Sequence, residues 1–454
     1  MTDPARALRE ARAALDAVIA EIQQVPRFRN FLAAPAFDDV AEAAREQPVT
    51  YLAAAERGGV ALVVRGADVT EVALPELTRR AVADGLRGYL DRYTEYRAAE
   101  TKAAETKAAG RPDRAVDEDR GGSLLTARRR WDDALADLTD WLWPTAMGPL
   151  VKELAGPETG RPAVPVPKVT LIPGGLLGLL PLHAAWRTDP ARPTGREYAL
   201  DHLQISYAPN ARTLSAARAV ADAVPGRKVL AVAPPPRAND LPMSAAEARA
   251  ARLAFPGGSL ERRLTADGLL TKLGAADVLH VACHGVADLA APLNSRLILA
   301  PGEEVTLSML MAQEVRIRLA VLSACETLLP GTELPDEVVS LPTGLIQAGA
   351  AGVIASMWAV PDLSSAMLMI EFYRHWRKAP DDPAAALRNA QIWLRDSTSR
   401  TRAEHFDGGG KWPPPSVTQE VLDRLSLLTP DEGGPPDLQD RAMTGWAAFA
   451  HIGV

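Results

Sequence analysis

The chain has 454 residues, 47% of them hydrophobic and 24% charged, which is typical of a globular protein too long for one core. Its formal net charge of −7 provides no general basic field and argues against a nucleic-acid partner. Cysteine occurs only as Cys283 and Cys325, which excludes a disulfide scaffold and favours a reducing, cytoplasmic setting.

The first 47 residues predict a helical segment rather than a targeting signal. Asp3 and Pro4 are typical of a helix start, and apolar residues then recur at helical spacing. The segment lacks the basic and then apolar layout of a signal peptide. We therefore treat residues 1–47 as an N-terminal helical segment.

The period of the hydrophobic pattern then changes, and residues 48–157 are expected to form an α+β region. Residues 49–74 contain three strand-like runs separated by glycine turns, which predicts a hairpin or meander. A polar stretch at 98–122 is either a solvated helix extension or a flexible loop. Residues 124–154 predict an amphipathic helix with a tryptophan-rich stripe, typical of core, which Pro144 kinks or divides.

A proline- and glycine-rich linker at 156–167 marks the main boundary, and residues 158–454 form the next predicted domain. Strand-like and helix-like runs alternate there, which predicts a mostly parallel sheet covered by helices on both faces. Residues 397–445 read as a loop-rich insertion around one short helix at 417–427. The last residues, 446–454, are expected to form the final strand.

One stretch, residues 341–360, is apolar enough to suggest a membrane span. It contains Pro342, Gln347 and several glycines, so a buried helix followed by a buried strand is the better interpretation. We expect a soluble protein that does not associate with a membrane.

Two apolar runs in the second domain end on potentially reactive side chains. DVLHVACHG ends at His284 and Gly285, and RLAVLSACET carries Cys325 close to its end. In open α/β sheets the carboxyl edge of the strands is where ligands bind. An imidazole beside a thiol favours the thiolate, and the backbone N–H groups of Gly285 and Cys325 could stabilise an oxyanion. This combination fits acyl transfer, although buried cysteine and histidine are also common in cores.

Other chemistries are less compatible with the same residues. Cys283 lies within the predicted strand and reads as an inert core thiol. His280 and His284 would lie about 13 Å apart on a regular strand, which argues against a zinc site built from these three residues. The chain has no phosphate-binding glycine motif, so we expect no nucleotide, no metal and no other cofactor.

The same motifs carry a family resemblance. HVACHGVAD followed by AVLSACET resembles the CHAT family of caspase-like cysteine proteases, which are related to separase. The similarity continues through residues 336–362 and the closing WAAFAHIG, and upstream through VTLIPGGLLGLLPLHAAW. The resemblance implies an α/β fold: a caspase-like, mostly parallel sheet flanked by helices and preceded by the α+β region. It also implies that residues 48–157 are a degenerate protease half rather than an independent domain.

By matching position, the resemblance assigns His284 as the base and Cys325 as the nucleophile, with Gly285 in the oxyanion hole. Asp362, in MWAVPD, matches an acidic position that faces the substrate residue before the scissile bond, which implies a preference for Arg or Lys. The alternative is that Asp362 caps the following helix, since carboxylates suit that position.

The chain departs from the family pattern in two places. Leu328, Leu329 and Pro330 follow SACET where the family usually has glycine, and residues 397–445 are longer than the minimal pattern. The insertion is expected either to cover the cleft or to receive a partner.

The leading hypothesis is therefore an intracellular cysteine endopeptidase that acts on a protein substrate and is activated by a regulatory protein or signal. The alternatives are a non-catalytic scaffold module that binds a partner protein, and a hydrolase or transferase acting on a small acyl substrate.

Overall fold

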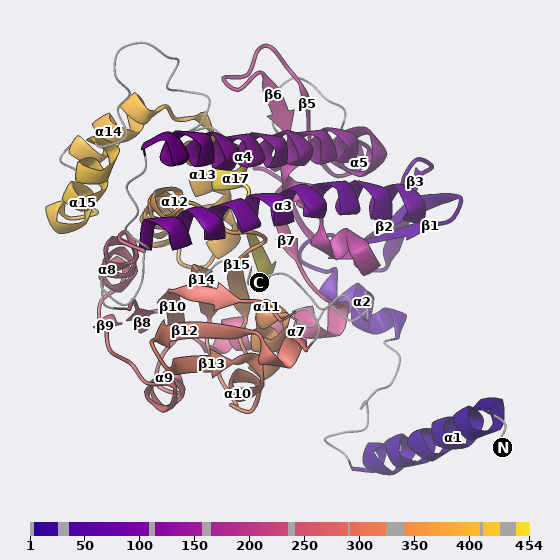
Figure 1. The fold of residues 1–454 in the computed structure, drawn as a ribbon. Coiled ribbons are helices and arrows are strands. Elements are labelled where there is room, and N and C mark those ends of the chain that lie inside the picture. The colour runs from indigo at the N-terminus through magenta and orange to yellow at the C-terminus, as the bar shows by residue number, and fades with distance from the viewer. Residues whose placement is uncertain are drawn as a thin grey trace.

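A computed structural model describes residues 4–25, 36–108, 114–156, 165–234, 241–288, 291–323, 340–408, 412–426 and 442–454. An eleven-stranded sheet runs through these residues (Figure 1). In chain order its strands are β1 (Val49–Ala55), β2 (Gly58–Arg65), β3 (Asp68–Leu74), β4 (Lys168–Pro173), β7 (Gln204–Tyr207), β8 (Val229–Val232), β9 (Ser259–Glu261), β10 (Val278–Ala282), β14 (Leu319–Ser323), β15 (Gly352–Ser356) and β16 (Phe449–Gly453).

In space the strand order is β3-β2-β1-β4-β7-β16-β15-β14-β10-β8-β9. Neighbours are parallel from β1 to β16 and from β15 to β9, while β3, β2 and β1 form the antiparallel meander expected at residues 49–74. The C-terminal strand β16 is antiparallel to β15. The expected fold class, a mostly parallel α/β sheet preceded by an α+β region, is confirmed.

The N-terminal helices are α1 (Pro4–Gln23), α2 (Phe37–Ala43), α3 (Arg79–Ala108) and α4 (Arg114–Leu142). The polar stretch at 98–122 is therefore helical wherever the structure describes it. At Pro144, which has no N–H to donate, α4 gives way to a π-helical turn, η2 (Trp143–Met147), and then to α5 (Gly148–Ala155). The expected division of this helix at the proline is confirmed.

The tryptophan-rich stripe belongs to the core, as expected. Trp131 of α4 is fully buried, stacks on Tyr96 of α3 and meets the edge of Trp358, which follows β15. Strand β1 pairs in parallel with β4, with Val49 opposite Thr170. The 48–157 region and the rest of the chain thus share a sheet and a hydrophobic cluster, and the proposed boundary between them remains a prediction.

The helices that follow β4 cover the two faces of the sheet. In chain order they are η3 (Gly175–Leu179), η4 (Leu182–Ala184), α6 (Ala199–His202), α7 (Ala211–Ala223), α8 (Ser244–Ala254), α9 (Ala266–Leu273), η5 (Pro292–Asn294), α10 (Leu307–Met311), α11 (Leu341–Ala348), α12 (Asp362–Trp376), α13 (Pro383–Asp396), α14 (Ser399–Asp407), α15 (Pro415–Ser426) and α17 (Met443–Trp446). Helices α8, α12 and α13 share one core cluster, while α9, α10 and α11 share another.

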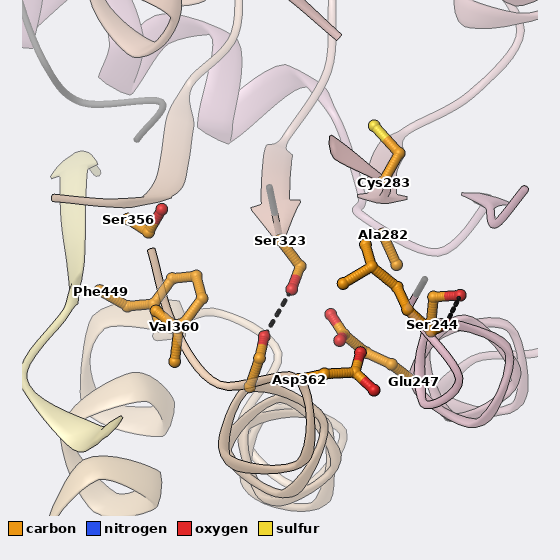
Figure 2. Close-up of a pocket in the computed structure, with 11 residues that line it drawn as sticks. Ser244, Glu247, Ala282, Cys283, Ser323, Ser356, Val360, Asp362 and Phe449 are labelled. Atoms are coloured by element: carbon orange, nitrogen blue, oxygen red, sulfur yellow. Dashed lines mark hydrogen bonds between the residues drawn. The ribbon is translucent and has the colours of Figure 1, made fainter. Parts of the chain in front are cut away.

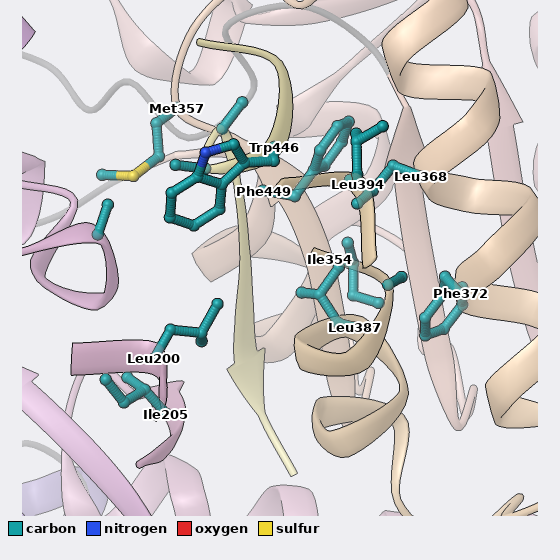
Figure 3. Packing of buried hydrophobic residues seen from close by; sticks show 14 of the residues in the cluster. Leu200, Ile205, Ile354, Met357, Leu368, Phe372, Leu387, Leu394, Trp446 and Phe449 are labelled. Atoms are coloured by element: carbon teal, nitrogen blue, oxygen red, sulfur yellow. The ribbon is translucent and has the colours of Figure 1, made fainter. Parts of the chain in front are cut away.

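The larger cluster fills the space between the sheet and α12 and α13. Leu368 and Phe372 of α12 and Leu387 of α13 pack towards Ile354 of β15 and Phe449 of β16 (Figure 3). This packing fixes α12 against the carboxyl ends of β14 and β15, where the site described below lies.

Some elements were not anticipated from the sequence. They are β11 (His284–Val286) and β13 (Glu303–Thr306), which flank β12 (Arg296–Ala300) in a three-stranded sheet, and the hairpin of β5 (Trp186–Thr188) and β6 (Arg196–Tyr198). The strand at residues 295–300 was expected. The predicted loop-rich insertion holds α14 as well as α15 in its described part, so it is more helical than expected. Residues 341–360 contain α11 and β15, and no helix in the described ranges is long and apolar enough to cross a membrane.

Candidate active site

The carboxyl ends of β10, β14 and β15 lie side by side in the middle of the sheet. In the parallel ladder Ala282 of β10 is opposite Ser323 of β14, and Leu322 is opposite Ala355 of β15. All three strands are buried apolar runs, so the polar side chains that follow them gather at one edge.

A pocket opens at this edge (Figure 2). Its wall comes from the ends of the strands and from the first turns of α8 and α12. The lining residues are Leu241, Ser244, Glu247, Ala282, Cys283, Ser323, Ser356, Val360, Asp362, Ser365 and Phe449. The pocket thus combines carboxylates and hydroxyls with an apolar wall, a composition typical of ligand-binding sites.

Asp362 is the first residue of α12, and its side chain does not cap that helix. Its Oδ2 instead accepts a hydrogen bond of 2.8 Å from the backbone N–H of Met243, at the start of α8. The carboxylate therefore satisfies an N–H that α8 leaves without an intrahelical partner. Burial raises the pKa of Asp362 to about 6. The capping role expected as an alternative is replaced by this bond across two helices.

Glu247 is a second, more deeply buried carboxylate in the pocket. It lies in the first turn of α8 and is 3% exposed. Its Oε1 lies 3.2 Å from Nε2 of His280. The other ring nitrogen of His280, Nδ1, is 3.1 Å from the hydroxyl of Tyr373 on α12. Glu247, His280 and Tyr373 form a buried row of polar side chains behind the pocket.

The hydroxyls of Ser323 and Ser365 are joined by a hydrogen bond of 2.8 Å across the pocket floor (Figure 2). This bond connects the end of β14 to the first turns of α12. The floor therefore has a fixed polar surface made by two elements far apart in the chain.

His284 begins β11, directly after β10 has ended, and is half-buried. It pairs with Ile298 of β12, and Gly285 pairs with Leu297. Cys283 is fully buried, and its thiol donates to the carbonyl oxygen of His284 at 3.3 Å. Figure 2 shows the Cys283 sulfur pointing away from the pocket floor.

The predicted nucleophile Cys325 lies outside the described residues, as do Leu328, Leu329 and Pro330. The structure therefore describes His284, Gly285 and Asp362 among the predicted site residues, and it brings Asp362 to the edge where β10 and β14 end.

The sequence argues against a zinc site at His280, Cys283 and His284. In the structure His280 contacts Tyr373 and Glu247, while Cys283 turns to a backbone carbonyl. Within the described ranges, no group of three or more histidines, cysteines or acidic residues could hold a metal ion.

Glu247 was missed at the sequence level. It occurs in SAAEARAARLA, an alanine-rich helical run in which a glutamate normally faces solvent. Only the packing of α8 against β8, β10 and α12 shows that this side chain is buried.

Comparison with known proteins identifies the family. The CHAT domain matches residues 136–454, more than half of the chain, and the chain belongs to this family. No curated protein matches it significantly.

Among solved structures, the separase–securin complex of Saccharomyces cerevisiae at 2.6 Å has a TM-score of 0.55 at 11% identity. A second structure of that complex, at 3.0 Å, has a TM-score of 0.53 at 9% identity. In both cases the similarity covers 92% of this chain but 30% of the separase chain. The Arg-specific cysteine proteinase gingipain R has a TM-score of 0.38 at 8% identity, over 68% of each chain. The likeness to separase shows that the chain has a caspase-like fold.

Proposed function

We propose that this protein is a cysteine endopeptidase that cleaves peptide bonds in a protein substrate inside the cell, with His284 as base and Cys325 as nucleophile. The pairing of β10 with β14 carries the proposal, because Ala282 and Ser323 are opposite each other and His284 and Cys325 each follow by two residues. Two residues of chain reach at most about 7 Å, and neighbouring strands lie about 5 Å apart. The dyad is therefore within reach, and membership of the CHAT family supports it.

The proposed chemistry is acyl transfer in two steps. His284 takes the proton of the Cys325 thiol, and the thiolate adds to the scissile carbonyl carbon. The C–N bond then breaks while the imidazolium gives its proton to the leaving amine. Water, deprotonated by His284, hydrolyses the resulting thioester and regenerates the thiol. The backbone N–H groups of Gly285 and Cys325 are the proposed donors to the oxyanion of each tetrahedral intermediate.

We assign the pocket to the substrate side chain that precedes the scissile bond. Asp362 lies in its wall, half-buried, beside the edge on which the dyad is proposed. An anion in a partly apolar pocket favours a basic side chain, so Arg or Lys is expected at this substrate position. Asp362 needs no change of position for this role, since Met243 occupies only one of its oxygens.

Regulation by a protein partner is part of the proposal. Helices α14 and α15 of the insertion pack on each other, and α15 also packs on α8 and α12, the helices that carry Glu247 and Asp362. An ion pair between Arg249 and Glu420 joins α8 to α15. A protein that bound α15 could therefore alter the pocket. The separase in the similar structures is in complex with securin, which makes such a partner reasonable here.

The test is peptide-library cleavage read by mass spectrometry with wild type, Cys325→Ala and His284→Ala. We expect cuts after Arg or Lys in wild type, a loss of at least about a thousand-fold in either variant, and a thiol-directed probe that labels Cys325. Cleavage that survives Cys325→Ala would end the assignment of the dyad. A wild type that binds a partner protein but cuts nothing even in its presence would favour the non-catalytic module.

A further inference from the structure

We infer that Glu247 is a second substrate-binding carboxylate, and that Glu247 and Asp362 together make the pocket select arginine over lysine. The inference rests on the proposed function in one respect, namely that a peptide substrate presents its side chain to this pocket.

Glu247 has the burial and orientation that a ligand site requires. It is among the pocket-lining residues, and Figure 2 shows its carboxylate directed at the floor below Ser323. Its Oε1 is fully buried, and no residue in the described part of the chain forms a hydrogen bond with it. The contact of 3.2 Å with Nε2 of His280 does not supply one, because that nitrogen is also left without a hydrogen bond. A buried carboxylate oxygen in this state needs a donor.

Asp362 faces the same space from the opposite helix. The charge of Glu247 contributes to the raised pKa of Asp362, after the larger effect of burial, so the two carboxylates are close enough to repel each other. Met243 donates to Oδ2 of Asp362 and leaves the other oxygen available to a ligand. A cation held between the two carboxylates would relieve this repulsion and supply the missing donor.

The arrangement suits a guanidinium better than an ammonium group. A guanidinium is planar and presents five N–H donors, so it can bond to two carboxylates that approach from different helices. A lysine ammonium is a compact, strongly hydrated charge that does not match a planar, bidentate arrangement. Apolar residues of the wall, such as Ala282 and Val360, can pack on the methylene groups of the side chain.

His280 and Tyr373 are positioning residues for Glu247. Burial, with a contribution from Glu247, raises the pKa of Tyr373, so its hydroxyl keeps its proton and can donate to Nδ1 of His280. In that tautomer Nε2 carries the proton and lies 3.2 Å from Oε1 of Glu247, but the two atoms do not form a hydrogen bond. The row holds the Glu247 carboxylate at the pocket without donating to its free oxygen.

The test compares matched fluorogenic peptides that differ only in Arg or Lys before the scissile bond. In wild type we expect kcat/KM to favour Arg by about ten- to a hundred-fold, the range for one additional hydrogen bond between charged groups. Glu247→Gln should reduce this ratio to about three-fold or less while far-UV circular dichroism stays unchanged. The matched control is Glu261→Gln, which removes a carboxylate paired with Lys272 at the sheet edge and should leave the ratio as in wild type.

A binding measurement separates this inference from the proposed function. If wild type cleaves no peptide, the proposed function fails. Titration calorimetry still measures how tightly the pocket binds agmatine, which carries a guanidinium, and 1,5-diaminopentane, which carries ammonium groups. Agmatine should bind more tightly than the diamine to wild type, and Glu247→Gln should remove the difference. The inference would be overturned if wild type cleaved the Arg and Lys peptides with equal kcat/KM. It would also be overturned if the Arg-to-Lys ratio of kcat/KM were unchanged in Glu247→Gln. If Glu247→Gln does not fold, the Arg-to-Lys ratio of kcat/KM in wild type decides alone.

Discussion

At the scale of single residues, the charge on Asp362 works against the stability of the fold. Burial raises its pKa to about 6 from the ordinary value of 3.8 for an aspartate, and Glu247 adds to the rise. A carboxyl group with a raised pKa contributes its stability in the protonated form. That stability is fully present below about pH 4 and is lost as the pH rises through about 6. Binding of a basic side chain has the opposite dependence, since it requires the anion.

Replacing Asp362 by asparagine should therefore make the fold less sensitive to pH. Asparagine keeps an oxygen for the N–H of Met243 but cannot ionise. Between about pH 4.5 and about pH 7, wild type should lose about 2 kcal/mol of unfolding free energy relative to Asp362→Asn. Urea unfolding of both proteins at the two pH values measures this difference. A stability difference that does not change with pH would show that the carboxyl group titrates normally.

The sequence indicated some of the site residues and not others, for physical reasons. His284 and Asp362 stand in motifs at the ends of apolar runs, where topology predicts a ligand edge. Glu247 stands in a helix whose buried face depends on its tertiary neighbours. The Asp362 bond to Met243 joins residues 119 positions apart, and no local pattern records it.

At the scale of elements, an aromatic cluster connects the N-terminal helices to the loop that precedes Asp362. Tyr93 of α3 packs on Trp131 of α4, and its hydroxyl accepts a hydrogen bond of 2.9 Å from the backbone N–H of Ala359. Trp358, the residue before Ala359, meets the edge of Trp131. The 48–157 region thereby helps to fix the residues that lead into α12.

Removing the hydroxyl in Tyr93→Phe should destabilise the protein by about 1–3 kcal/mol, because the buried N–H of Ala359 loses its acceptor. The matched control is Tyr96→Phe on the same helix, which keeps its stacking on Trp131 and loses a half-buried bond to Glu100. That control should cost less than about 1 kcal/mol. Urea unfolding measures both. Equal costs would show that the Tyr93–Ala359 bond contributes nothing specific.

Long elements were predictable because the same spacing of hydrophobic residues recurs over many positions. The meander, α3, α4, α12 and the buried strands all carry such patterns. The hairpin of β5 and β6 has three residues in each strand, and β13 has four, too few for a period to be recognised. Helix α14 has nine residues and many polar side chains, so its sequence resembles a loop.

At the scale of the whole molecule, β16 joins the two parts of the sheet. It pairs with β15 on one side and β7 on the other, and Ile452 is opposite both Val353 and Tyr207. In the sheet formed by the described residues, β1 and β4 are therefore connected to β14 and β10 through β7, β16 and β15.

This topology predicts that the sheet unfolds as one unit. In hydrogen exchange measured by mass spectrometry along a urea series, peptides from β1 and from β14 should lose protection at the same midpoint. Ile452→Ala should lower both midpoints together and cost about 2–5 kcal/mol, since the side chain is 4% exposed. Val69→Ala on β3, where the side chain is 48% exposed, should shift neither midpoint by a comparable amount. Separate midpoints for β1 and β14 would instead show that residues 48–157 form an independent domain. A domain that only packs against the rest of the chain would unfold in a cooperative transition of its own.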